Sequence, residues 1–215
     1  MGAEQTRKKI LTAFLALAGE QGMAAITTKE IATAAGVNEV TLFRHFGDKA
    51  NLALEAVKAF SPAAQIDAFE PKIDASSPET TIEGLLACVH ELRHHLEGRA
   101  EVMQFGMSEA TRYPELLEEI KKNPMAARRM LTRAFHQAAP QLRPGVDIDA
   151  EVLGLLGTQL LTTMWSARGW GELVPGEADR LVTARLRLIM REGPSNPEPA
   201  ARCDGVSTAG TSGGL

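Results

Sequence analysis

The sequence predicts an all-α protein with an N-terminal three-helix unit and a larger helical C-terminal region. Apolar residues recur at the three- and four-residue spacing of helices along most of the chain. Turn and capping residues separate these stretches from one another. The 215 residues are 44% hydrophobic and 23% charged, a composition that suits a globular protein with a sizeable core.

Residues 27–46 predict two short helices around a tight turn. Thr27 is placed to cap the first helix, and Glu30, three residues later, completes a capping box. Gly36 can take the positive φ that ends a helix without a Cβ clash. Asn38 is a good cap for the second helix. The capping and turn signals therefore agree on a helical hairpin.

The apolar residues of the hairpin indicate which side of each helix is buried. Ile31 and Ala35 line the first helix, and Leu42 and Phe46 lie four residues apart on the second. Residues 4–20 form an amphipathic helix that can complete a three-helix unit. This is the layout of a helix-turn-helix, whose second helix enters the major groove of DNA. The alternative is a helical hairpin without a DNA function.

A family resemblance rests on a set of residues in the first quarter of the chain: Ile31-Ala32, Ala35-Gly36-Val37, Thr41-Leu42-Phe43-Arg44-His45-Phe46, Lys49 and Leu52. They resemble the DNA-binding domain of the TetR family of transcriptional regulators. The resemblance implies a homodimer that binds a palindromic operator in double-stranded DNA. It also implies a repressor whose larger domain binds an unknown small-molecule effector that releases the DNA.

The pattern and the resemblance together divide the chain into three parts. Residues 1–47 are expected to form the helix-turn-helix domain. Residues 48–192 are expected to form the ligand-binding and dimerisation domain, with 48–60 as a connecting helix. Residues 193–215 are rich in Pro, Gly and Ser and are predicted to be a disordered tail. Further helices are predicted at about 79–98, 99–112, 114–122, 125–139, 149–168 and 177–192, after a loop at 61–78 with a short helix near 63–69.

The DNA-contacting residues are expected on the second helix of the hairpin and beside it. The resemblance places Thr41 and His45 near bases or phosphates, and Lys49 at a phosphate. Phe43 stands where the family usually has tyrosine, so an apolar contact with a thymine methyl replaces a hydroxyl contact. Glu39 either accepts from a cytosine amino group or stabilises the helix start. The full predicted set is Thr28, Lys29, Asn38, Glu39, Val40, Thr41, Phe43, Arg44, His45 and Lys49.

A dimer interface is expected on the last two helices. The helix at 149–168 is apolar nearly all round, so several of its sides must be covered. Burial inside one subunit is the alternative to pairing across a two-fold axis, which the resemblance implies. The predicted interface residues are Val152, Leu153, Leu156, Leu160, Leu181, Ala184 and Leu188.

A soft apolar ligand pocket is expected in the C-terminal domain, where Met and aromatic residues are frequent. As a set, these residues also fit an ordinary core. The candidates are Met103, Phe105, Met107, Met130, Phe135, Met164 and Trp165.

Other reactive side chains give weaker signals. His90 and His94 share a helix face, but no third ligand stands out, so no metal or other cofactor is predicted. Cys88 lies in an apolar helical stretch and is expected in the core, with a redox sensor as the alternative. No nucleophile and base have a credible spacing, and the chain is therefore not expected to be an enzyme.

Charge and hydropathy limit the classes of protein to which the chain can belong. The net charge is −4, with +1 in residues 1–50 and −5 in the remainder, which favours a slightly basic tip on an acidic body. No apolar run predicts a membrane span or a signal peptide, so a cytoplasmic protein is expected. Two rivals remain: a helical enzyme or small-molecule carrier without a DNA function, and a DNA-binding activator without an effector.

Overall fold

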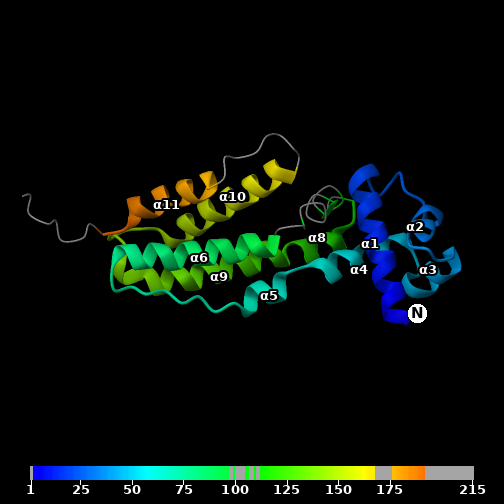
Figure 1. The fold of residues 1–215 in the computed structure, drawn as a ribbon, viewed down its shortest axis with the longest axis horizontal. Coiled ribbons are helices and arrows are strands. Elements are labelled where there is room, and N and C mark those ends of the chain that lie inside the picture. Colours follow the sequence, from blue (N-terminus) through cyan, green and yellow to red (C-terminus); the bar gives the residue numbers. More distant parts are fainter. Residues whose placement is uncertain are drawn as a thin grey trace, which may run out of the picture.

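A computed structural model describes residues 2–96, 99, 105–106, 109, 112–167 and 176–191. The fold is elongated and helical, with a small group of helices at one end and a longer layered bundle at the other (Figure 1). The small group contains α1 (Ala3–Gln21), α2 (Thr28–Ala34) and α3 (Glu39–Phe46). Helix α4 (Lys49–Phe60) joins it to the rest of the molecule.

The N-terminal core lies between the helices of the small group and α4. Phe14 of α1, Ile31 of α2 and Leu42 of α3 are fully buried there. The core continues into α4 through Leu52 and Ala56, so it extends beyond the first 47 residues. The predicted packing of three helices is therefore confirmed, with α4 as a further wall.

The C-terminal core is built around α9 (Lys122–Ala138). Its apolar face packs on α5 (Ala63–Ala68), α6 (Pro78–Leu96) and α10 (Ile148–Ala167). Helix α11 (Glu177–Ile189) covers α6 and α10 on the other side, and α8 (Pro114–Ile120) lies between α9 and α4. The described part of the chain contains no strand, only an isolated bridge between Leu142 and Met190.

Most predicted helices are confirmed within two or three residues. Helix α9 begins earlier than predicted because Pro124 sits in its first turn, where a missing N–H breaks no helical hydrogen bond. Helix α11 ends at Ile189, and the next residue is extended and joins the bridge. Most of the helix predicted at 99–112 and nearly all of the tail predicted at 193–215 lie outside the described residues.

One cysteine and two of the histidines that could be reactive are buried in the core or lie beside a carboxylate. Cys88 is buried in the C-terminal core, and burial raises the pKa of its thiol to about 11, as suits a packing residue. His90 and His95 each lie 3.1 Å from a carboxylate oxygen, of Asp179 and Glu91 respectively. Among the described residues, no three His, Cys, Asp or Glu side chains gather as metal ligands would. None of the described helices has the length and apolarity that a membrane crossing requires.

Candidate nucleic-acid interface and ligand cavity

The start of α2 is fixed by a reciprocal cap. The Thr27 hydroxyl accepts from the backbone N–H of Glu30 at 3.2 Å, and the Glu30 carboxylate accepts from the backbone N–H of Thr27 at 2.7 Å. The hydrogen bonds from Thr27 lower the pKa of Glu30. The predicted capping box is thus confirmed, and it sets where the first helix of the hairpin begins.

The turn and the start of α3 also have the predicted conformation. Gly36 has a φ of +67°, a backbone conformation that residues with a Cβ rarely adopt. The Asn38 side-chain oxygen accepts from both the backbone N–H and the hydroxyl of Thr41, each at 2.8 Å. Asn38 and Thr41, two of the predicted DNA contacts, therefore define the first turn of α3.

Glu39 bridges the two helices of the hairpin. The Thr28 hydroxyl, at the start of α2, donates to the Glu39 carboxylate at the start of α3. A carboxylate between two helix N-termini is favoured by both helix dipoles. This arrangement supports the second of the two predicted roles of Glu39, stabilisation of the helix start.

The solvent side of α3 carries an apolar pair and a cation. Val40 is 76% exposed and Phe43 is 44% exposed, whereas Leu42 is fully buried. Arg44 is exposed, and His45 is half-buried beside the ring of Phe46. Val40 and Phe43 are three positions apart and therefore neighbours on one face of α3, where they form a small exposed apolar patch of the kind that marks a contact surface. Lys29, in the first turn of α2, is also exposed.

Lys49 has a role that the sequence did not indicate. Its ammonium group donates to the backbone carbonyls of Met23 and Ile26, at 2.8 Å each. These carbonyls belong to the connection between α1 and α2, so Lys49 ties that connection to α4. Two of its three donors are used, so we expect Lys49 to hold this connection in place of the phosphate contact that the resemblance implies.

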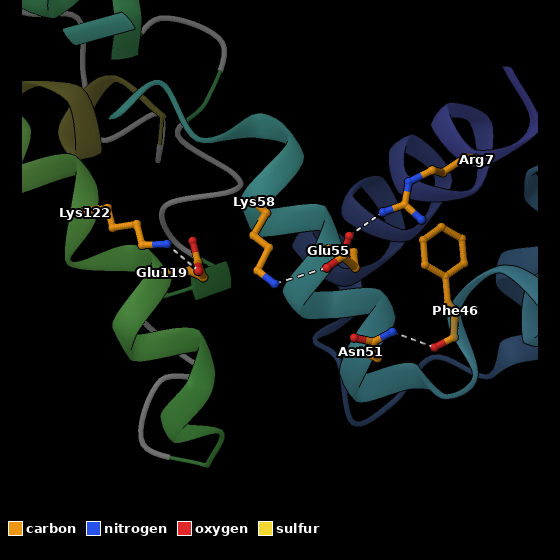
Figure 2. A network of polar contacts seen from close by, with 7 residues as sticks. All are labelled: Arg7, Phe46, Asn51, Glu55, Lys58, Glu119 and Lys122. Carbon is orange, nitrogen blue, oxygen red and sulfur yellow. Dashed lines mark hydrogen bonds and ion pairs between the residues drawn. The ribbon is translucent and has the colours of Figure 1, made fainter. Parts of the chain in front are cut away.

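Helix α4 is held to the hairpin and α1 by polar contacts (Figure 2). Arg7 of α1 pairs with Glu55 of α4, and its guanidinium lies 4.9 Å from the centre of the Phe46 ring. Asn51 donates to the Phe46 carbonyl at 2.9 Å. Burial by itself would raise the pKa of Glu55, but Lys58 and Arg7 outweigh it and lower that pKa. A shift of α4 must therefore move α3 or break these contacts.

A cavity of about 420 Å³ opens at the other end of α4. Its walls come from α4, α5, α6, α8, α9 and α10. The lining residues are Val57, Phe60, Pro62, Ile66, Leu92, Leu96, Arg99, Ile120, Asn123, Pro124, Ala127, Leu153, Leu156, Gly157, Gln159 and Leu160. The volume lies within the range of small-molecule sites, and nearly all of the lining is apolar.

The polar side chains of the cavity wall are few. The Asn123 amide oxygen accepts from the Ser61 hydroxyl at 2.7 Å. Arg99 donates to the carbonyl of His95. Gln159 is 1% exposed, and its amide oxygen accepts from Arg93. No carboxylate lines the cavity among the described residues.

Three of the predicted pocket residues lie elsewhere. Met130 and Phe135 are fully buried in the C-terminal core, because they face inward from the central helix α9. Phe105 is buried in the N-terminal core, where its ring packs on Phe14. These three residues therefore do not line this cavity, and the alternative of ordinary core describes them.

The other predicted pocket residues are not in the described lining. Met103 and Met107 lie outside the described residues, and the side chain of Met164 does too, although its backbone belongs to α10. Trp165 is partly exposed on α10 and is not among the lining residues.

The predicted dimer residues divide into three groups. Val152 is fully buried in the C-terminal core, so its assignment to a dimer interface is wrong. Leu153, Leu156 and Leu160 line the cavity. The remaining three form an exposed apolar stripe along α11: Leu181, Ala184 and Leu188.

Comparison with known proteins addresses the hairpin directly. Residues 10–56 match the family model described as bacterial regulatory proteins, tetR family. This segment therefore resembles the DNA-binding segment of the TetR family. The matched segment spans most of α1, all of α2 and α3, and the first two turns of α4.

Two curated relatives of the chain are HTH-type transcriptional regulators. It is 29% identical over 126 residues to the uncharacterised regulator YvkB of Bacillus subtilis, covering 59% of this chain. It is 31% identical over 87 residues to BetI of Rhizobium meliloti, covering 40% of this chain. The matches span 64% and 43% of the lengths of these two relatives.

Solved structures share the fold over nearly the whole chain. NalD of Pseudomonas aeruginosa, the secondary repressor of the MexAB-OprM multidrug efflux pump, superposes with a TM-score of 0.68 at 21% identity. That comparison covers 89% of this chain and all of NalD. The ketosteroid regulator KstR2 of Mycobacterium tuberculosis has a TM-score of 0.61 at 21% identity, covering 86% and 95% of the two chains.

Proposed function

We propose that this protein is a sequence-specific DNA-binding repressor that a small apolar effector releases from a palindromic operator. The observation that carries the proposal is the α3 surface, which presents Val40, Phe43 and Arg44 from a helix with a fixed start. Its resemblance to the DNA-binding segment of the TetR family and its likeness in fold to the repressor NalD support this function. Such a protein acts in the cytoplasm, where the operator lies.

The contacts of α3 with DNA follow from its exposed side chains. Val40 and Phe43 are suited to thymine methyl groups, which a major groove presents as an apolar surface. Arg44 and Lys29 are suited to phosphates or guanine edges. The remaining residues of the proposed set position the helix or its backbone against the duplex: Thr28, Asn38, Glu39, Thr41, His45 and Lys49.

Two copies of the chain are expected to pair through α10 and α11. Leu161 of α10 is 61% exposed, and Leu188 of α11 is 70% exposed. A homodimer of this kind would place two α3 helices about 34–36 Å apart, one turn of DNA, or a multiple of that spacing.

The cavity provides a route by which an effector would change DNA affinity. Val57 and Phe60 of α4 form part of its wall, and the preceding turns of α4 hold Arg7 and Phe46. A ligand that prefers one position of α4 would favour one spacing of the two α3 helices. DNA release then follows as a shift between populations, limited by the ligand's differential affinity for the two.

The test is selection of genomic fragments by the purified protein, followed by binding titrations on the selected sequence. The expected result is a palindromic site bound by a dimer, with at least about 1,000-fold preference over unrelated DNA. Phe43→Ala is expected to relax the preference at thymine positions, by no more than the about 1–3 kcal/mol that a mismatched base pair costs. Its control is Leu117→Ala, an exposed apolar residue of α8 outside the proposed surface. Equal affinity for selected and unrelated DNA would overturn the proposal.

A further inference from the structure

The Gln159 amide has a fixed orientation in the cavity wall. Its oxygen accepts from the Arg93 Nε at 3.3 Å. A guanidinium only donates, so the amide oxygen must face Arg93 and the amide nitrogen must face away from it. Arg93 in turn donates to Asp179 at 2.8 Å, and the two opposite charges leave no net charge behind Gln159.

The amide nitrogen of Gln159 is buried and has no hydrogen-bond acceptor in the described part of the chain. Buried donors are nearly always paired in folded proteins, and an unpaired one is a reason to look for a missing partner. Its neighbours in the wall cannot serve, since Leu156 and Leu160 carry no polar side-chain atom.

We propose that the amide nitrogen of Gln159 is the polar anchor of the effector, and that the cavity takes an uncharged apolar molecule with one accepting oxygen, such as a ketone. The inference rests on the proposed function, in which this cavity is the effector site. The mostly apolar wall disfavours charged or highly polar molecules, because it offers few groups to replace the hydrogen bonds that such molecules lose with water. Arg99 and Asn123 also carry donors in the wall, but among its described residues the Gln159 nitrogen is the donor that is buried without an acceptor, so it selects for an acceptor and fixes its position.

Three compounds of one shape test this chemistry. Benzophenone has a carbonyl oxygen, diphenylmethane lacks it, and diphenylacetate carries an anion instead. Each is titrated calorimetrically into the full chain. The quantity compared is the ratio of ketone to hydrocarbon affinity, because it cancels the shared apolar contacts. Gln159→Met keeps the size of the side chain and removes the donor, and it is expected to lower that ratio at least about five-fold.

Two further variants distinguish the effect of losing the hydrogen-bond donor from the effect of changing the shape of the cavity wall. Leu160→Met also changes the cavity wall, but it removes no donor, so the ratio should stay within about two-fold of the wild type. Gln159→Glu puts an acceptor in the same place beside Arg93. It is expected to favour benzhydrol, which has a donating hydroxyl, over benzophenone.

Several outcomes would overturn the proposal. One is a ratio unchanged in Gln159→Met. Another is diphenylacetate binding most tightly and losing its affinity in Arg99→Ala, which would make the site one for anions. A third is failure of all the compounds to bind the wild type. Operator binding is measured separately without ligand, so loss of the repressor function and loss of this ligand chemistry give different results.

Discussion

The ring of Phe105 packs edge to face on the ring of Phe14, with centroids 5.4 Å apart and planes at 89°. Phe105 follows α6 in the chain, yet it is buried in the N-terminal core. The next residue, Gly106, lies against Ile120, because a Cβ there would be 2.7 Å from the Ile120 Cδ1 atom. Ile120 lines the cavity. A second physical connection besides α4 therefore joins the cavity to α1.

Phe105→Ala should lower the free energy of unfolding by about 3–5 kcal/mol, because it leaves a cavity in a packed core and removes an aromatic pair. Denaturant titration of the purified variant measures the loss. Phe43→Ala is a suitable control, since the same truncation at a partly exposed site should change stability by less than about 0.5 kcal/mol. Equal losses in the two variants would contradict the buried position of Phe105.

Lys49→Met should destabilise the protein without changing the salt dependence of DNA binding. The variant keeps the apolar stem but leaves the Met23 and Ile26 carbonyls without their donor, a loss of about 1–3 kcal/mol. Lys29→Met should do the reverse: stability stays, while the slope of log affinity against log salt falls by about one. Operator titrations at several salt concentrations give the slopes. If Lys49→Met instead lowers the slope of log affinity against log salt and keeps full stability, Lys49 contacts a phosphate.

Leu188→Glu and Leu161→Glu should each convert a dimer to a monomer. A two-fold axis would place each new carboxylate in an apolar interface, and we expect the dissociation constant to rise at least about 100-fold. Sedimentation equilibrium measures the change. Leu117→Glu introduces the same charge on an exposed apolar site of α8 and should leave the association unaltered. A dimer that persists in the Leu188→Glu and Leu161→Glu variants would exclude this face as the interface.

The helix-turn-helix could be predicted from sequence because its determinants are local. The cap at Thr27, the turn at Gly36 and the cap at Asn38 act within four residues of themselves. Leu42 and Phe46 follow from helical periodicity alone. Lys49 could not be placed in this way, because its partners are carbonyls that are more than twenty positions earlier in the chain.

The cavity could not be predicted because its wall is assembled from many helices. Residue type suggested Met130 and Phe135, but their positions on the inward face of α9 bury them completely. An apolar helix such as α10 must be covered on several sides, and the sequence does not say by what. Here Val152 faces the core, Leu156 faces the cavity, and Leu161 faces solvent.

The Asp179 carboxylate gives a pH dependence whose sign can be worked out. Burial alone would raise its pKa, but the hydrogen bond and charge of Arg93, with His90 nearby, outweigh burial and lower it. A lowered pKa stabilises the fold above the unfolded value of about 3.9, and that stability is lost as pH falls through the folded value. Asp179→Asn should therefore be less stable than the wild type at pH 7, with the gap closing below about pH 4. Denaturant titrations across pH measure the gap. Asp149→Asn breaks only the exposed pair with Arg128, so it should show a much smaller gap, and a constant gap in Asp179→Asn would refute the linkage.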